Sequence, residues 1–257
     1  MKKFLFILKK IFILLSIIGS VAGIIFLLVA SNKYQRQTPF KKLHVDIDFT
    51  KALFFISEEE IQNAFNYVFP NASKRKIENI NLYAFEKHIK SNPYVADAEV
   101  YADMKGDVFI QIVQKEPLLR IINNNGVSYY LDINGKKMPL SDNFTARVPV
   151  ATGYIESISD VEKDSVIQKQ LFDLISFIRN DEFLLALCEQ IDVKENGEME
   201  IIPKLSKHHF LIGNADDLSG KFRRMKIFIN EVLQSDTVGN FTLVNLKYKN
   251  QIICAKN

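Results

Sequence analysis

Residues 43–48 read LHVDID, and their apolar and polar side chains alternate as they do along a half-buried β-strand. Downstream, Ser57-Glu58-Glu59-Glu60 has the pattern of a capping box. The Ser57 hydroxyl can cap the first turn of a helix while Glu60 reaches back. Apolar residues then follow at helical spacing, and Pro70 closes the segment. This region therefore predicts a strand followed by an amphipathic helix.

A second helix and two more strands are predicted after Pro70. A short helix begins near Asn81, and Pro93 ends it because the residue before a proline disfavours helical geometry. Its apolar face comprises Leu82, Phe85 and Ile89. Residues 98–102 and 107–113 read as strands joined by a turn at Lys105-Gly106. The order β-α-α-β-β requires the first strand to join the last two, with both helices packed on one face.

A second unit begins near Leu118, where short strands alternate with turn sequences. Asn134-Gly135 and Asn196-Gly197 predict hairpins, because both residue types tolerate positive φ. A helix is predicted from about Ser165, and a last helix follows Asp216-Asp217, whose carboxylates can cap its start. These elements predict a mostly antiparallel sheet backed by helices, so the fold class of the whole chain is α+β.

The chain ends in a predicted strand at 241–248, a turn at Lys249-Asn250 and a strand at 251–254. A terminal strand often lies at a sheet edge, where unpaired N–H and C=O groups can accept a strand from a partner. Apolar contacts would come from Phe241, Leu243, Leu246, Tyr248 and Ile252. These same residues could equally complete the core, and the pattern alone does not separate the two interpretations.

The N-terminus carries a long apolar segment. Residues 11–30 contain no charge, and twenty helical residues span roughly 30 Å, the thickness of the hydrocarbon core. Four lysines precede the segment, which favours a cytoplasmic N-terminus and a body outside the cytoplasm. The alternative is a signal peptide cleaved near Ser20-Val21-Ala22, but the apolar run continues from Ile24 to Ala30, an extension that a signal peptide does not need.

The charge distribution argues against a nucleic-acid-binding body. The 257 residues include 33 basic and 30 acidic groups. Residues 1–36 hold six of the basic groups and none of the acidic ones, which leaves 27 basic against 30 acidic in the remainder. The positive excess belongs to the N-terminus, whereas phosphate binding needs a concentrated basic face.

The sequence offers no motif for catalysis. Phosphate-binding loops, zinc-ligand spacings and nucleophile elbows are absent, so we predict no catalytic residue, no cofactor and no metal. His208-His209 is a histidine pair whose side chains should point to opposite faces of a strand, and we expect it at the surface. Arg223 and Arg224 are expected to face solvent, with a partner-facing role as the alternative. Cys188 and Cys254 are expected to be free and buried.

Several motifs, in this order, resemble the FtsQ/DivIB cell-division family. They are VQKEP at 113–117, YLDING at 130–135, VPVATGY at 148–154 and VNLKYKN at 244–250. Tyr154 stands where the family usually has proline, and Asn245 and Lys247 stand where it has aspartate and arginine. The basic tail, apolar span, β-α-α-β-β module and β-rich second domain follow the same order as in the family, whose module is a POTRA domain.

This resemblance implies a domain plan. The plan comprises a cytoplasmic tail at 1–10, a transmembrane helix at 11–30, a linker at 31–40, a POTRA-like domain at 41–116 and a β domain at 117–257. It also implies a non-enzymatic scaffold of the bacterial division septum. The protein would be a single-pass type II protein of the cytoplasmic (inner) membrane, with its body in the periplasm or outside.

The resemblance further implies that the β domain binds small bitopic partners, FtsB held with FtsL, by strand addition near the last long strand. Other division proteins would be recruited through the POTRA domain. The expected partner-binding residues are Phe241, Val244, Asn245, Leu246, Lys247, Tyr248, Asn250 and Ile252. Two alternatives are a POTRA-bearing secretion or assembly factor and a membrane-anchored hydrolase using His208, His209 and Cys188.

Overall fold

The computed structural model describes residues 15–27, 37–155, 166–204, 206–232 and 241–255. The chain divides into two compact units, Met1–Thr50 with Ile56–Gln114, and Lys51–Phe55 with Lys115–Asn257. Residues 15–27 are helical. Among the described residues, no helix has both the length and the apolar character that crossing a bilayer requires. The predicted span at 11–30 and the predicted linker lie partly outside these residues, and the predicted tail lies wholly outside them.

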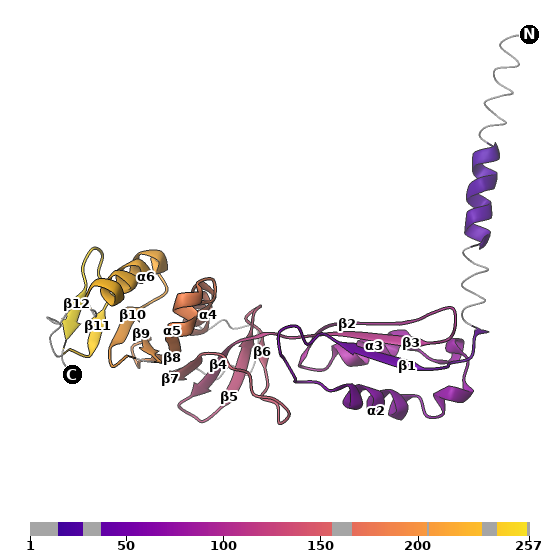
Figure 1. The fold of residues 1–257 in the computed structure, drawn as a ribbon, viewed down its shortest axis with the longest axis horizontal. Coiled ribbons are helices and arrows are strands. Elements are labelled where there is room, and N and C mark those ends of the chain that lie inside the picture. Colours follow the sequence, from indigo (N-terminus) through magenta and orange to yellow (C-terminus); the bar gives the residue numbers. More distant parts are fainter. Residues whose placement is uncertain (1–14, 28–36, 156–165, 205, 233–240, 256–257) are drawn as a thin grey trace, which may run out of the picture. The chain divides into compact units, whose positions relative to one another are not determined.

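The first unit is a three-stranded sheet with helices on one side (Figure 1). Its elements are β1 (Leu43–Ile47), α2 (Glu58–Val68), η1 (Ala72–Lys74), η2 (Ile77–Asn79), α3 (Leu82–Lys90), β2 (Val95–Ala102) and β3 (Val108–Gln114). The strand order is β1-β3-β2, with β1 parallel and β2 antiparallel to β3. The predicted order of elements and the joining of the first strand to the last two are confirmed.

Local side-chain chemistry explains where the two helices begin. The Ser57 hydroxyl accepts a hydrogen bond from the Glu60 amide at 3.1 Å, and the Asn81 side chain accepts one from Ala84 at 3.0 Å. Each bond satisfies an amide that the first turn of a helix leaves without a partner. The helices bury Phe65 and Phe85, whose ring centroids lie 5.3 Å apart in an edge-to-face contact.

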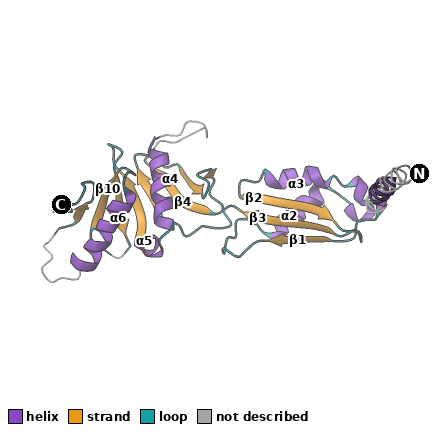
Figure 2. Ribbon diagram, turned by 90° about the horizontal axis from the view of Figure 1, so that it is seen from above, coloured by secondary structure: helices purple, strands orange, loops and turns teal. Residues whose placement is uncertain are grey.

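The second unit is built on a nine-stranded sheet (Figure 2). Its strands are β4 (Pro117–Asn123), β5 (Ser128–Asp132), β6 (Lys137–Met138), β7 (Val150–Gly153), β8 (Cys188–Val193), β9 (Met199–Pro203), β10 (His209–Gly213), β11 (Leu243–Asn245) and β12 (Ile253–Ala255). The order is β12-β11-β10-β9-β8-β7-β4-β5-β6. Three neighbouring pairs are parallel and five are antiparallel, so the prediction of a mostly antiparallel sheet is confirmed.

Helices cover one face of this sheet. They are α4 (Val166–Arg179), α5 (Glu182–Leu187) and α6 (Leu218–Ile227), the last continued by the π-helical turn η3 (Phe228–Val232). The stripe of α4 that faces the sheet consists of Leu171, Leu174, Ile175 and Ile178, all fully buried. Inward residues of the strands, such as Ile121, Ile191 and Ile201, complete one continuous hydrophobic core. Burial of these side chains supplies most of the stabilisation of the unit.

The sequence does not indicate β7 as a strand. It lies at the centre of the sheet, parallel to both β4 and β8. The segment is only four residues long and reads Val-Ala-Thr-Gly, which has no clear alternation of apolar and polar side chains. Its position depends on two neighbours that are distant in sequence, which local patterns cannot reveal.

The predicted strand at 241–248 is much shorter in the structure. Regular pairing ends at Asn245, whose side chain accepts a hydrogen bond from the Lys247 amide at 3.0 Å. Such an Asx turn redirects the backbone away from the sheet. Separately, Lys51–Phe55 belongs to the second unit although it lies within the predicted 41–116 range, and the Phe55 ring meets that of Phe144 at 4.9 Å.

Candidate partner-binding edge

The two last strands form a hairpin at one end of the nine-stranded sheet. β11 pairs in parallel with β10, with Phe210 opposite Val244, and antiparallel with β12, with Val244 opposite Cys254. Among the described residues, β12 has β11 as its single strand neighbour. The outer side of β12 is therefore the open edge, whereas both sides of β11 are already paired.

The structure separates the eight predicted partner residues into two groups. Val244 and Leu246 are fully buried and belong to the hydrophobic core, so at these two positions the core interpretation holds. The half-buried or exposed residues are Phe241, Asn245, Lys247, Tyr248, Asn250 and Ile252. The open edge consists of Ile253, Cys254 and Ala255, all exposed, and none of them was among the predicted partner residues. Ile253 and Cys254 end the last predicted strand, 251–254, and Ala255 follows it directly, so this position was the signal available in the sequence.

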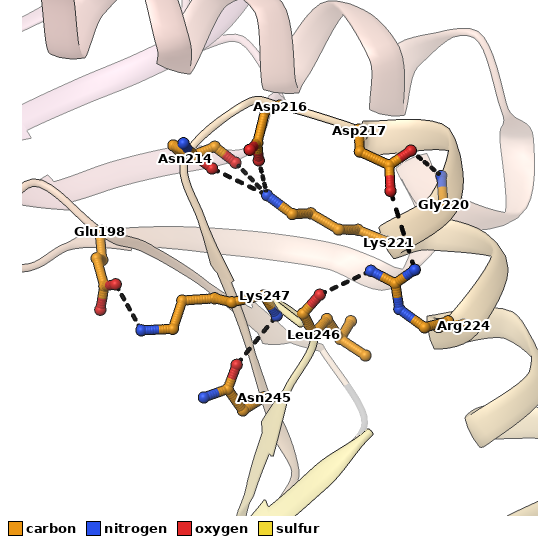
Figure 3. A network of polar contacts seen from close by, with 10 residues as sticks. All are labelled: Glu198, Asn214, Asp216, Asp217, Gly220, Lys221, Arg224, Asn245, Leu246 and Lys247. Carbon is orange, nitrogen blue, oxygen red and sulfur yellow. Dashed lines mark hydrogen bonds and ion pairs between the residues drawn. The ribbon is translucent and has the colours of Figure 1, made fainter. Parts of the chain in front are cut away.

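A buried arginine holds the turn after β11. Arg224, on α6, is 8% exposed, and its Nη2 donates to the Leu246 carbonyl at 2.9 Å (Figure 3). Its Nη1 lies 4.0 Å from the Asp217 carboxylate. The expectation that Arg224 faces solvent is wrong, because its guanidinium supplies a donor to a buried carbonyl that the sheet leaves unpaired. The preceding Arg223 is exposed, as expected.

The start of α6 is fixed by four polar residues, Asn214, Asp216, Asp217 and Lys221. The Asp217 carboxylate accepts from the Gly220 amide at 3.3 Å, which confirms the predicted cap. The Lys221 ammonium, 3% exposed, donates to the Asn214 carbonyl and side-chain oxygens at 3.0 Å and also binds Asp216 (Figure 3). The hydrogen bond from Lys221 holds the pKa of Asp216 below its ordinary value. These contacts keep α6, and with it Arg224, in place.

Lys247 is held within its own chain. Its ammonium donates to the Glu198 carboxylate at 2.6 Å, and this bond raises the pKa of Lys247 and lowers that of Glu198. The aliphatic stem lies so close to Gly213 that a Cβ there would come within 2.9 Å of it. A half-buried ion pair of this kind, still open to solvent on one side, contributes little to stability. Its main effect is to fix the path of the chain between β11 and β12.

The histidine pair occupies two different environments. His208 is 5% exposed, with its ring 5.0 Å from that of Phe241 and 6.2 Å from that of Phe228. The His209 Nδ1 lies 2.8 Å from the Glu200 carboxylate. The surface expectation is wrong for His208, because its ring completes an aromatic cluster under the start of β11.

His208 makes the stability of this region dependent on pH. Burial, together with the nearby charge of Lys207, lowers the pKa of His208, although a backbone hydrogen bond with Phe241 opposes the shift. The unfolded chain, with a histidine pKa near about 6.5, binds the proton first as pH falls. We therefore expect the free energy of unfolding to decrease below about pH 6.5. Urea titrations from pH 7.5 to 5 should show this, and His208→Phe should weaken it.

The exposed His88 supplies the control for that measurement. His88→Phe removes a histidine from the surface of α3 rather than from the aromatic cluster around His208, so it controls for the effect of a histidine-to-phenylalanine change as such. An unaltered pH dependence in His208→Phe would contradict the assignment to the buried ring.

The two cysteines are free, as expected, but only Cys188 is buried. Cys254 is exposed on β12, so the expectation of burial is wrong for it, because an edge strand has no neighbour to cover it. Burial raises the pKa of Cys188 to about 12, which leaves little thiolate at neutral pH. Among the described residues, no group of three or more His, Cys, Asp or Glu side chains could hold a metal ion.

Comparison with known proteins yields matches for both units. Residues 116–255 match the family "FtsQ/DivIB, C-terminal related", and residues 40–113 match the POTRA-like domain family. The chain is also similar to the cell division protein DivIB of Clostridium tetani (strain Massachusetts / E88), with 26% identity over 178 residues. That alignment covers 69% of this chain and 61% of the Clostridium protein.

Proposed function

We propose that this chain, which belongs to the FtsQ/DivIB family, is a non-enzymatic scaffold of the bacterial division septum. A span at 11–30 would anchor it in the cytoplasmic membrane, with both units on the far side from the lysine-rich tail. The family match and the similarity to a cell division protein support the role in division. The POTRA-like unit would recruit further division proteins.

The observation that carries the mechanism is the open side of β12. Because β11 is paired on both sides, a partner strand would add to Ile253–Ala255 rather than to the VNLKYKN segment itself. Main-chain hydrogen bonds would provide affinity, and neighbouring side chains would provide selectivity. Small bitopic partners resembling FtsB, held with FtsL, are compatible with strand addition, because this kind of binding requires only an extended segment from the partner. Exposed Tyr248 and Asn250 would flank it.

Two other functions are less well supported. A POTRA-bearing secretion or assembly factor remains compatible with the first unit, but the match of residues 116–255 points to the division family. A hydrolase would need a reactive group. Cys188 is buried with its pKa raised to about 12, and the His208 ring is buried beside phenylalanines.

Proline substitutions along β12 test strand addition. Proline removes the backbone amide donor. The effects of Ile253→Pro, Cys254→Pro and Ala255→Pro on stability and on partner binding should therefore differ, according to whether each amide points towards β11 or outwards. A proline that removes an outward amide should leave the thermal midpoint nearly unchanged. It should also weaken co-purification of a co-expressed FtsB–FtsL pair by about tenfold or more, the loss expected when an interface donor is removed.

Alanine is the matched control substitution at Ile253 and Cys254, and serine is the control substitution at Ala255. These variants retain every main-chain donor and should keep the partners bound. Undiminished co-purification in all three proline variants, each with a normal thermal midpoint, would refute strand addition at β12.

A further inference from the structure

One end of the first unit is built from three chain segments locked together by backbone hydrogen bonds. The Phe40 amide donates to the Arg75 carbonyl at 2.9 Å, and the Ile77 amide donates to the Thr38 carbonyl at 3.0 Å. On the other side, the Lys41 amide donates to the Gly106 carbonyl at 2.9 Å. Residues 38–42 thus lie between residues 72–77 and the β2–β3 turn at 103–107.

This end of the unit is rich in basic side chains. Six of them come from the three segments, namely Lys41, Lys42, Lys74, Arg75, Lys76 and Lys105. All are exposed except Arg75, which is half-buried. Among the described residues, Lys76 is the one member that forms an ion pair, at 3.8 Å with Glu78.

The acidic groups nearby are already engaged. The Asp103 carboxylate accepts hydrogen bonds from the backbone amides of Lys105 and Asp107, each at 2.9 Å, and also feels the charge of Lys105. The Asp107 carboxylate lies 3.8 Å from the His44 ring. These carboxylates remain charged, but with Glu78 they number three, against six basic groups. The surface therefore has a net positive charge, which favours an anionic partner.

Aromatic side chains lie beside the basic residues on the face of the sheet opposite the helices. The Phe109 ring stacks on that of His44 at 4.8 Å and on that of Tyr101 at 5.4 Å, so that the row crosses all three strands. Tyr101 is 44% exposed, and Met104, in the adjacent turn, is 56% exposed. Basic residues next to exposed aromatic and apolar side chains are typical of proteins that lie on a membrane surface.

The chain length holds this surface near the bilayer. The Thr38 carbonyl is already bonded within the unit, and the proposed span ends at Ala30. The seven residues between them allow eight steps from Cα to Cα, which can extend over at most about 28 Å. A short tether to the membrane gives this surface a high effective concentration of lipid headgroups, so even a weak lipid-binding site would be occupied.

We infer that this basic end of the first unit binds anionic lipid headgroups at the outer surface of the membrane that anchors the chain. The inference rests on the proposed membrane span. It goes beyond the scaffold role, because it fixes which end of the POTRA-like unit is turned towards the lipid. Since membrane electrostatics decay within about 8 Å at physiological salt, the contact requires direct apposition.

The absence of tryptophan from the chain allows a sharp test. Tyr101→Trp in the full-length protein places a sole indole within the aromatic row. The protein is reconstituted in vesicles of phosphatidylcholine alone, or of phosphatidylcholine and phosphatidylglycerol in equal parts, each containing headgroup-labelled quencher lipid. We expect a blue-shifted, quenched emission in the anionic vesicles, at least about twofold dimmer than in the neutral ones, and reversal by high salt.

Matched variants assign the effect to the basic surface. Lys74→Glu, Lys76→Glu and Lys105→Glu together should abolish the quenching. Lys87→Glu, Lys136→Glu and Lys169→Glu, exposed lysines elsewhere, should not. A Tyr83→Trp reporter on α3 should stay unquenched.

Three results would overturn the inference: quenching that is equal in the two vesicle types, quenching that survives the first triple substitution, or quenching that is absent. Flotation of the same samples separates this failure from failure of the proposed function. A chain that floats with the vesicles but is not quenched retains its anchor and lacks the lipid contact. A chain that does not float has lost the proposed span as well.

Discussion

Replacing Gly153 by alanine is expected to destabilise the second unit by roughly 3–5 kcal/mol, enough to unfold a marginal domain. Gly153 ends β7 with φ of +98°, a conformation that L-residues rarely adopt. A Cβ there would overlap the Val193 carbonyl oxygen, which already accepts a hydrogen bond from the Tyr154 amide at 2.9 Å. The obstacle is backbone at the centre of the sheet, so no side-chain rotation can relieve it.

Gly126→Ala is the matched control for that substitution. Gly126 also has a positive φ, of +76°, but a Cβ there would meet no atom within 4 Å. Only the conformational penalty remains, about 1–2 kcal/mol. Urea unfolding of both variants, followed by circular dichroism, gives the comparison. An equal decrease in the free energy of unfolding in the two variants would mean that backbone overlap at β7 does not cause the destabilisation.

Arg224→Ala is expected to cost roughly 2–4 kcal/mol and to loosen the edge hairpin. The substitution removes the donor to the Leu246 carbonyl and leaves that buried oxygen without a partner. It also removes the buried stem of the side chain from the core beneath α6. The free energy of unfolding should fall, and amide exchange in β11 and β12 should accelerate more than in β4 and β5.

The neighbouring Arg223 provides the comparison, because it belongs to the same helix but is exposed. Arg223→Ala should change the free energy of unfolding by no more than about 0.5 kcal/mol. Arg224→Lys should recover only part of the lost free energy of unfolding, since the lysine side chain is shorter and its ammonium lacks the planar set of donors of a guanidinium. Full recovery in Arg224→Lys would show that charge alone, rather than guanidinium geometry, supports the hairpin.

Local chemistry explains which parts of the fold were predictable. The caps at Ser57 and Asp217, the helix start near Asn81 and the Asn-Gly hairpins each depend on a few adjacent residues, and the structure contains all of them. The helical stripe of α4 is likewise a property of one segment. Such features need no knowledge of what the segment will pack against.

The features that sequence reasoning missed depend on distant partners. The half-buried β7 becomes a central strand only because β4 and β8 flank it. Arg224 and His208 have polar side chains of types that are usually exposed to solvent. In the fold, the Arg224 guanidinium binds the Leu246 carbonyl and the His208 ring packs beside the Phe241 ring. The candidate edge shifted from the VNLKYKN segment to β12 for the same reason, since only the strand order shows that β11 is enclosed.

The parallel pairing of β10 with β11 has a consequence for folding. Parallel neighbours need a crossover, and here α6 lies between the two strands in the chain. The hairpin of β11 and β12 can therefore join the sheet only after the crossover through α6 brings β11 beside β10. Long-range closure of this kind is slow compared with local helix formation. Until this closure is complete, β12 has no strand to pair with. The open edge at β12 thus exists only in the fully folded second unit.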